Sequence, residues 1–509
     1  MDVVVGETPL TEAQVVAVAR DGSPVSIAQA SLQRLVAGRD HVDRLAASDV
    51  PAYGISTGFG ALATKHIPVA ERAQLQRSLI RSHAASSGAE VDAETIRGMA
   101  LLRLQTMATG HTGVRPQTAQ AYADLLNAGI TPVVGEYGSL GCSGDLAPLA
   151  HVALAVMGEG IVRYDGELKC AEEALARAGL EPVELAEKEG LALINGTDGM
   201  LAMLMLCSHD VARLLKVADI AAAMSVEALL GTDRTLAADL VGLRPHPGQI
   251  AAARNMRLLL EGSPLVASHS GPEDTRVQDA YSLRCAPQVA GACRDTLDHV
   301  RLVAARESAA AIDNPVLLDD GRIESNGNFH GAPIGYALDF LAIPLADLAS
   351  ISERRTDRLL DKSRSHGLPA FLAHDPGVDS GLMIAQYTQA GIVSELKRIA
   401  APASADSIPS SAMQEDHVSM GWSAGRKLLR AVDGLTRVLA IEVMAAARAL
   451  DLRSPLAAAA GTAAAVSAVR TVCEGPGHDR YLAPEIEAVV GLVASGALVD
   501  AVEVVCRLD

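Results

Sequence analysis

The sequence predicts a mainly α-helical protein built around a bundle of long helices, and two observations support this prediction. Aromatic residues make up only 3% of the 509 residues, with a single tryptophan, and alanine and leucine take their place. This composition favours closely packed helices over sheets. Long stretches of the second half of the chain also contain almost no glycine or proline. Helices of such length are typical of bundles, which usually associate with copies of themselves.

The long helices are expected at four places after residue 197. Residues 200–230 hold no glycine or proline and would reach about 46 Å as a single helix. Residues 336–360 form a second helix, with a kink expected at Pro344. A shorter helix is predicted over residues 381–400, and another long one over residues 426–452.

The first part of the chain, residues 1–197, is predicted to be a separate domain in which short helices alternate with loops. Thr11 and Gln14 have the spacing of a capping box, so a helix should begin there. Loops rich in glycine and proline follow, for example over residues 127–144. The remaining residues, 198–509, form the predicted bundle and its C-terminal helices.

Composition also argues against several classes of partner. The formal net charge of −18 argues against nucleic acid or an anionic membrane as the main partner. Seven cysteines without a C-x-x-C motif indicate reduced thiols, and the fourteen histidines lack metal-binding spacing, so no metal is predicted. The N-terminus lacks the features of a signal peptide, and charged residues interrupt the most apolar segment. We therefore expect a cytoplasmic protein that does not cross a membrane.

The segment YGSLGCSGDLAPLAH, residues 137–151, has Cys142, Ser143 and Gly144 at its centre. Such a string is most often a simple turn. A serine hydrolase would require G-x-S-x-G, but Asp145 occupies the last position. A third interpretation is a self-condensation, in which the Gly144 nitrogen attacks the Cys142 carbonyl and two waters are lost.

The product of that condensation would be a 4-methylidene-imidazol-5-one (MIO), an electron sink made without any external cofactor. Each residue type has a reason. Gly144 lets its nitrogen fold back without a clash, because it has no Cβ. Ser143 supplies the leaving hydroxyl and the electrophilic carbon, while Cys142 contributes only its carbonyl.

Several segments together resemble the aromatic amino acid ammonia-lyase family, whose members form MIO from Ala-Ser-Gly or a close variant. They are, in chain order, YGISTGFG (53–60), RSHAAS (81–86), GSLGCSGDLAPL (138–149), LALINGTDGM (191–200), VQDAYSLRCAPQ (277–288), SNGNFHG (325–331) and SSAMQEDHVSM (410–420). The resemblance implies the long-helix fold of the fumarase/aspartase type. It also implies a homotetramer with active sites shared between subunits.

Elimination of ammonia from an α-amino acid requires an electrophile, a base for the β-proton and groups that bind the carboxylate and the side chain. Tyr53 is the candidate base, and Tyr281 and Glu415 qualify as well. Arg284 is the candidate for binding the carboxylate, because its planar guanidinium matches two oxygens. Gln278 and Tyr281 are expected on the same helix face as Arg284.

The other candidates are assigned on the resemblance. Asn195 is expected to donate to the prosthetic group or the substrate, although it also suits a helix cap. Phe329 would pack beside the substrate ring, although ordinary core packing is the alternative. His83 and Glu415 are polar residues that can pair with the two nitrogens of an imidazole ring, whereas a site for phenylalanine would be apolar there.

The resemblance is strongest to family members that act on L-histidine. It implies a lyase that converts L-histidine to trans-urocanate and ammonia, the first step of L-histidine degradation. The nearest alternative is a lyase or aminomutase acting on tyrosine or phenylalanine, and a remote one is a helical scaffold without catalysis. Two questions stay open: which residue abstracts the β-proton, and whether the electrophile bonds the amine or the imidazole.

Overall fold

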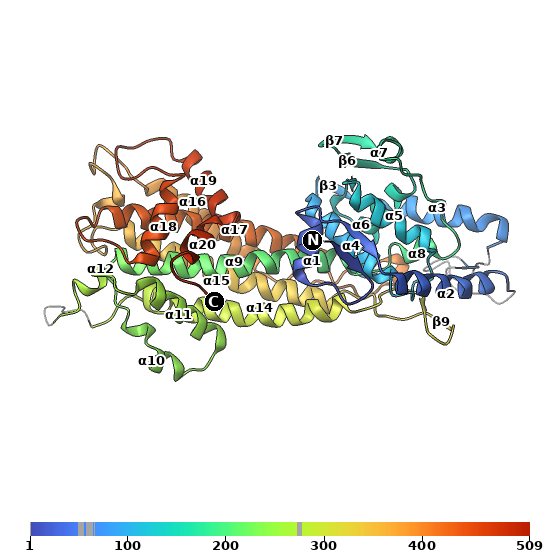
Figure 1. Ribbon diagram of the computed structural model, residues 1–509, viewed down its shortest axis with the longest axis horizontal. Helices are drawn as coiled ribbons and strands as arrows, with labels where there is room; N and C mark the ends of the chain where they lie inside the picture. Colours follow the sequence, from blue (N-terminus) through green and yellow to red (C-terminus); the bar gives the residue numbers. More distant parts are fainter. Residues whose placement is uncertain (1, 49–54, 58–64, 66, 272–276) are drawn as a thin grey trace. The chain divides into compact units, whose positions relative to one another are not determined.

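The computed structural model describes residues 2–48, 55–57, 65, 67–271 and 277–509 (Figure 1). Helices dominate this part of the chain and the strands are short, so the predicted mainly α fold is confirmed. The chain forms two compact units, each assembled from three stretches. The first comprises residues 1–209, 300–339 and 402–428, and the second comprises residues 210–299, 340–401 and 429–509. The division at residue 197 that the sequence suggested stays a prediction.

The first unit contains most of the short helices. Its first helix, α1 (Glu12–Ala19), begins with the predicted capping box. The Gln14 amide donates to Thr11 Oγ1 at 3.3 Å, and the Thr11 amide donates to Gln14 Oε1 at 2.9 Å. The short helices that follow are α2 (Gln29–Ala46), α3 (Arg72–His83), α4 (Ala93–Met107), α5 (Pro116–Asn127), α6 (Leu146–Val156), α7 (Ala171–Ala178) and α8 (Glu189–Ala192).

Short strands connect the loops of the first unit. They form the parallel pair β1 (Val3–Val5) and β2 (Val25–Ile27), the antiparallel pair β3 (Ser87–Glu90) and β5 (Gly135–Tyr137), the sheet β4 (Thr131–Pro132), β6 (Ile161–Tyr164) and β7 (Glu167–Cys170), and the hairpin β8 (Val316–Leu317) and β9 (Ile323–Glu324). In the β3–β5 pair, Ser87 lies opposite Tyr137. This pairing brings the chain that follows α3 beside the chain that leads into the Cys142 loop.

The long helices begin and end within a few residues of their predicted positions. The four predicted helices are α9 (Asp198–Ala228), α15 (Ala332–Leu360), α16 (Met383–Ile399) and α17 (Gly421–Asp451). A fifth long helix, α14 (Ala286–Ser308), was not predicted. Helix α15 continues through Pro344. Its length and apolar composition would also suit a membrane-crossing helix, but 61% of its most apolar 18-residue stretch is buried inside the protein. That burial is the pattern of a core helix.

In the second unit, the buried carboxylate of Glu442 on α17 links three long helices. Ser225 on α9 donates to Glu442 Oε1 at 2.7 Å, and Ser352 on α15 donates to Oε2 at 2.6 Å. Arg355 on α15 pairs with the same carboxylate at 2.5 Å. These helices run side by side in Figure 1. Because removal of one partner of a buried ion pair costs about 3–5 kcal/mol, this cluster fixes the register of the helices.

Shorter helices complete the second unit. They are α10 (Ala238–Gly242), α11 (Pro247–Leu260), α12 (Pro264–Ala267), α13 (Tyr281–Arg284), α18 (Ala460–Arg470), α19 (Ala483–Ala494) and α20 (Ala497–Glu503). Of these, α18 packs against both α11 and α20.

Candidate functional site

The tripeptide Cys142-Ser143-Gly144 lies in a loop between β5 and α6, with its backbone pressed against another segment. Gly144 has a φ of +75° and pairs with Gly196 in a parallel bridge. The amide of Asp145 donates to the Gly196 carbonyl at 2.7 Å. A Cβ on Gly144 would lie only 2.1 Å from the Gly196 oxygen, so both the space and the conformation require glycine here.

Residues far along the chain hold the loop on the other side of the tripeptide. The Gly141 carbonyl accepts hydrogen bonds from Ser419 Oγ at 2.9 Å and from the Gly331 amide at 3.2 Å. The Leu140 carbonyl accepts from the Met420 amide at 2.8 Å. The tripeptide is therefore held on both sides by hydrogen bonds to the backbone of its loop, and we call these hydrogen bonds the loop clamp.

Asp145 anchors the end of the loop inside the protein. Its Oδ1 accepts from Ser139 Oγ at 2.9 Å, and its Oδ2 accepts from the Met200 amide at 2.8 Å. Burial raises the pKa of Asp145 to about 7, although these hydrogen bonds favour the carboxylate. The carboxyl thus ties the loop to the first turn of α9.

His83 lies at the C-terminal end of α3 and is half-buried. Its Nδ1 lies 2.9 Å from the Leu79 carbonyl oxygen, so Nδ1 carries the proton and Nε2 is the hydrogen-bond acceptor. Burial lowers the pKa of His83, although the nearby carboxylate of Glu415 favours the charged ring. Neutral His83 therefore offers an acceptor beside Glu415.

Glu415 connects His83 with the tripeptide. Ser410 Oγ donates to Glu415 Oε2 at 3.0 Å, and the backbones of the two residues pair as well. The negative charge of Glu415 acts on both the Cys142 thiol and the His83 ring, where it raises the pKa of each group. Glu415 therefore lies near both His83 and Cys142, although the three residues are far apart in the sequence.

The thiol of Cys142 is held in its protonated form. Burial, followed by the negative charge of the nearby Glu415, raises the pKa of Cys142 to about 12. Only the thiolate is nucleophilic, and a thiol with this pKa is about 10⁻⁴ ionised at pH 8.

We therefore expect iodoacetamide to leave Cys142 unmodified at pH 8 in the folded protein. The exposed Cys170 is the matched control and should be alkylated within the same time. Peptide mapping by mass spectrometry measures both modifications. Alkylation of Cys142 as fast as that of Cys170 would contradict the assigned protonation state.

Asn195 is buried one residue before Gly196. Its Nδ2 lies 3.2 Å from the Asn314 carbonyl oxygen and 3.4 Å from the Leu191 carbonyl oxygen. Because both groups are acceptors, the amide nitrogen faces them and Oδ1 is turned away. The predicted role of Asn195 as a donor stays a prediction and would require the amide to rotate.

Phe329 is half-buried in the segment after β9. Next to it, the ring of His330 lies 5.5 Å from the ring of His417, and His330 Nε2 lies 3.3 Å from the His417 carbonyl oxygen. Neither His330 nor His417 was among the site residues predicted from the sequence. The only signal was that each lies inside a segment that resembles the family, next to Phe329 in one case and close to Glu415 in the other.

Three candidates belong to the second unit. The guanidinium of Arg284 lies 4.6 Å from the centre of the Tyr281 ring. Gln278 and Arg284 line one cavity of about 170 Å³, together with Arg234 and His269. The prediction that Gln278 shares a helix face with Tyr281 and Arg284 is wrong, because α13 spans only Tyr281–Arg284.

The reason for the short helix lies in the segment before it. Ala280 has an extended backbone, with φ −62° and ψ 153°. Asp279 Oδ2 accepts a hydrogen bond from the Thr232 amide at 2.7 Å, which holds the chain away from a helical path. Among the other candidates, Tyr53 lies outside the described residues.

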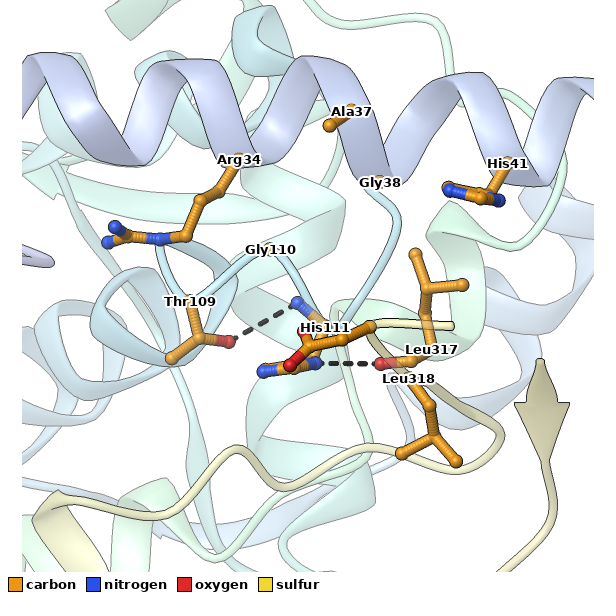
Figure 2. A pocket seen from close by; sticks show the side chains of 10 residues that line it. Arg34, Ala37, Gly38, His41, Thr109, Gly110, His111, Leu317 and Leu318 are labelled. Carbon is orange, nitrogen blue, oxygen red and sulfur yellow. Dashed lines mark hydrogen bonds between the residues drawn. The ribbon is translucent and has the colours of Figure 1, made fainter. Parts of the chain in front are cut away.

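A separate cavity of about 140 Å³ lies in the first unit (Figure 2). Figure 2 shows Arg34, Gly38 and His41 on α2 facing the loop of residues 109–111 and the segment at Leu317. His111 Nδ1 lies 2.7 Å from the Leu317 carbonyl oxygen in its wall. None of the described candidate residues lines this cavity.

Comparisons with known proteins agree over nearly the whole chain. Residues 10–471 match the family described as aromatic amino acid lyase. The chain is 62% identical over 505 residues to a histidine ammonia-lyase of Streptomyces avermitilis, covering 99% of this chain and 98% of that protein.

Solved structures give the same picture. The chain resembles histidine ammonia-lyase from Trypanosoma cruzi with a TM-score of 0.92 and 38% identity, covering 100% of this chain and 96% of the other. It resembles tyrosine aminomutase from Streptomyces globisporus with a TM-score of 0.94 and 37% identity, covering 100% of both. The chain therefore belongs to the aromatic amino acid lyase family, and it is a lyase.

Proposed function

We propose that this lyase eliminates ammonia from L-histidine to give trans-urocanate, with an MIO formed from Cys142, Ser143 and Gly144. The observation that carries the proposal is the position of the tripeptide, clamped on both sides and next to the polar pair of His83 and Glu415. The 62% identity to a protein named histidine ammonia-lyase supports the choice of substrate. The reaction would open L-histidine degradation in the cytoplasm.

The residues of the loop fit an MIO. Gly144 already has a left-handed backbone, and the Gly196 carbonyl fills the space that a side chain would need. Cys142 and Gly144 are buried, while the half-buried Ser143 keeps access to a substrate. Once formed, the MIO would supply an electrophilic methylidene carbon, and no external cofactor is needed.

The groups around the tripeptide suit an imidazole ring. A histidine side chain carries one N–H donor when neutral and two when protonated. Glu415 and the Nε2 of His83 are both acceptors, so they can receive these hydrogens. Phenylalanine offers neither donor, and burial of these polar groups against its ring would be unfavourable. Phe329 would pack against the face of the substrate ring.

The amino acid end of the substrate requires other groups. We propose that Arg284 binds the substrate carboxylate, because its guanidinium can form two parallel hydrogen bonds with the two oxygens. Gln278 lines the same cavity as Arg284. Because the Nδ2 of Asn195 faces the Leu191 and Asn314 carbonyl oxygens, we assign its Oδ1 as an acceptor for the substrate amine, in place of the donor role expected from the sequence. Tyr53, Tyr281 and Glu415 remain the candidates for the base that removes the β-proton.

The test uses the purified protein with L-histidine, L-tyrosine and L-phenylalanine in turn. The ultraviolet absorbance of the unsaturated acid and the release of ammonia are followed for each. We expect both signals with L-histidine alone. Both signals with L-tyrosine or L-phenylalanine instead of L-histidine would indicate a lyase for that amino acid. Formation of β-tyrosine from L-tyrosine would indicate an aminomutase.

We also propose that the protein is a homotetramer whose active sites use residues of more than one subunit. Ile343 on α15 and Ile384 and Tyr387 on α16 expose apolar side chains, with 46%, 59% and 61% of their surface accessible. Apolar groups exposed on long helices are typical of surfaces that bind another subunit.

Light scattering coupled to size exclusion should therefore give four times the chain mass of 52.7 kDa. Replacement of Ile384 by aspartate should shift the protein toward smaller species, because a charge would be buried in the contact. The matched control is Leu243→Asp, also exposed but on a loop after α10. A wild-type protein that is active as a 52.7 kDa monomer would contradict the assembly.

A further inference from the structure

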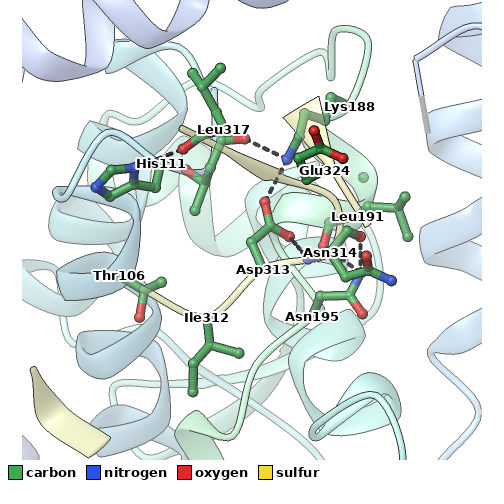
Figure 3. A network of polar contacts seen from close by, with 12 residues as sticks. Thr106, His111, Lys188, Leu191, Asn195, Ile312, Asp313, Asn314, Leu317 and Glu324 are labelled. Carbon is green, nitrogen blue, oxygen red and sulfur yellow. Dashed lines mark hydrogen bonds and ion pairs between the residues drawn. The ribbon is translucent and has the colours of Figure 1, made fainter. Parts of the chain in front are cut away.

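A buried ion pair is connected to Asn195 by a short chain of hydrogen bonds. Lys188 and Asp313 are both fully buried, and Lys188 Nζ donates to Asp313 Oδ2 at 2.5 Å (Figure 3). Lys188 Nζ also donates to the Thr112 carbonyl at 2.8 Å. Lys188 has a φ of +70°, a left-handed conformation that lysine rarely adopts. The protein thus holds this side chain in place against both desolvation and backbone strain.

Asp313 also holds the next residue, Asn314, in position. The other carboxylate oxygen of Asp313, Oδ1, accepts from the Asn314 amide at 2.8 Å. The backbone carbonyl oxygen of Asn314 in turn accepts a hydrogen bond from Asn195 Nδ2 at 3.2 Å. Figure 3 shows Lys188, Asp313, Asn314 and Asn195 in this sequence. The orientation of the Asn195 amide therefore depends on Asn314, which is fixed by the ion pair.

Asn314 also holds the segment that carries Phe329. Its Oδ1 accepts from Ser325 Oγ at 3.0 Å and from the Asn326 amide at 3.1 Å. The Nδ2 of Asn326 donates back to the Asp313 carbonyl at 2.9 Å. The side chain of Asn195 and the start of the segment that leads to Phe329 are thus both hydrogen-bonded to one dipeptide.

The segment after Asn314 is anchored as well. His111 Nδ1 lies 2.7 Å from the Leu317 carbonyl oxygen, and the Leu317 amide donates to the His111 carbonyl at 2.8 Å. Because Thr112 follows His111 and accepts from Lys188, the loop of residues 111–112 holds both ends of the 313–317 segment. The dipeptide has little freedom to shift.

We propose that Lys188 and Asp313 are positioning residues of this lyase, which set the Asn195 amide and the Ser325–Phe329 segment through Asn314. This inference rests on the proposed function, because it concerns the same site. Neither residue contacts the tripeptide in the proposal; both act through Asn314.

Ordinary stabilisation is a weaker explanation for the pair. A buried ion pair is often no more stable than a well-packed apolar pair of the same volume, so its burial alone contributes little. Here each charge instead orients backbone groups: Thr112 O by Lys188, and the Asn314 amide by Asp313. Arg103 and Asp198 belong to the same buried region, where Arg103 Nη1 donates to the Asn195 carbonyl at 2.5 Å. The backbone of Asn195 is thus held separately from its side chain.

The test is the double variant Lys188→Met/Asp313→Asn, which removes both charges together and keeps an acceptor for the Asn314 amide. The matched control is Arg294→Met/Asp219→Asn, which removes an ion pair of 2.6 Å between α14 and α9. We expect kcat for L-histidine to fall 10-fold or more in the first variant and less than 2-fold in the control, at similar loss of Tm. In an Asn195→Ala background, the Lys188→Met/Asp313→Asn change should lower kcat further by a smaller factor than in the wild type, because only the contacts to Ser325 and Asn326 remain to be lost.

Hydrogen exchange gives a readout that needs no activity. Amides in peptides covering residues 191–200 and 325–331 should exchange at least 10-fold faster in the Lys188→Met/Asp313→Asn variant, and at the wild-type rate in the control. Unchanged exchange in both peptides would overturn the inference. A wild-type protein inactive on L-histidine would overturn the proposed function instead, while the exchange result would still decide the positioning role.

If the double variant does not fold, Lys188→Arg provides the second test. It keeps the charge but changes the shape and reach of the donor. Loss of kcat with an unchanged Tm supports positioning. Full activity of a folded Lys188→Arg protein, with wild-type exchange in both peptides, overturns it.

Discussion

Replacement of Ser143 by alanine is expected to abolish urocanate formation from L-histidine, with a fall in kcat of roughly 10³-fold or more. Alanine has no hydroxyl to lose, so the methylidene carbon of an MIO cannot form. The fold should survive, because the hydrogen bonds of the loop clamp are made by Gly141, Asp145 and their partners. Urocanate absorbance measures the activity, and circular dichroism with thermal unfolding measures the fold.

The matched control is Cys142→Ala, one residue earlier in the same loop. This substitution produces the tripeptide Ala-Ser-Gly, from which members of the aromatic amino acid ammonia-lyase family form MIO. The variant should stay active, because only the backbone carbonyl of residue 142 takes part in the condensation. Intact mass separates the two variants. Wild type and Cys142→Ala should each be lighter than their sequences by two waters, and Ser143→Ala should not be. A wild-type mass without that loss, or an active Ser143→Ala protein, would refute the proposed chemistry.

Replacement of Glu415 by glutamine is expected to lower kcat/KM for L-histidine about 10- to 100-fold. A hydrogen bond to a charged group contributes about 1.5–3 kcal/mol, and the amide would lose this charge next to the substrate ring. The carboxylate is half-buried and held by Ser410, so water cannot easily replace it. Steady-state kinetics with L-histidine provides the measurement.

The control for this substitution is Asp416→Asn, the exposed neighbour in the same segment, which should change kcat/KM by less than 2-fold. If Glu415 binds the imidazole, the variant should also discriminate less against L-phenylalanine. Equal effects of Glu415→Gln and Asp416→Asn would show that the charge of the segment, and not a contact of Glu415, is responsible.

Local structure could be predicted from the sequence because its causes are local. The capping box of Thr11 and Gln14 needs only neighbouring residues, and the helix ends near residues 200, 360 and 452 follow from the spacing of apolar residues and of glycine and proline. The same reasoning failed at Gln278. There a contact from Thr232, more than forty residues earlier, decides that the chain is extended.

The contacts of the site could not be predicted in this way. The resemblance named Gly144, Asn195 and Glu415 as candidates, but not the bridge between Gly144 and Gly196 or the hydrogen bond from Ser410 to Glu415. Lys188 carries no motif, and a lysine is usually a solvated surface residue. Its role becomes visible only when Asp313, which is 125 residues away, is found beside it.

The loop clamp has a consequence for biosynthesis. Gly141 and Leu140 are held by Gly331, Ser419 and Met420, so most of the polypeptide must leave the ribosome before the clamp can close. A nascent chain that ends before residue 419 lacks Ser419 and Met420. If the condensation depends on the loop clamp, an unfinished chain on the ribosome carries no reactive alkene, and the electrophile forms only after translation is nearly complete.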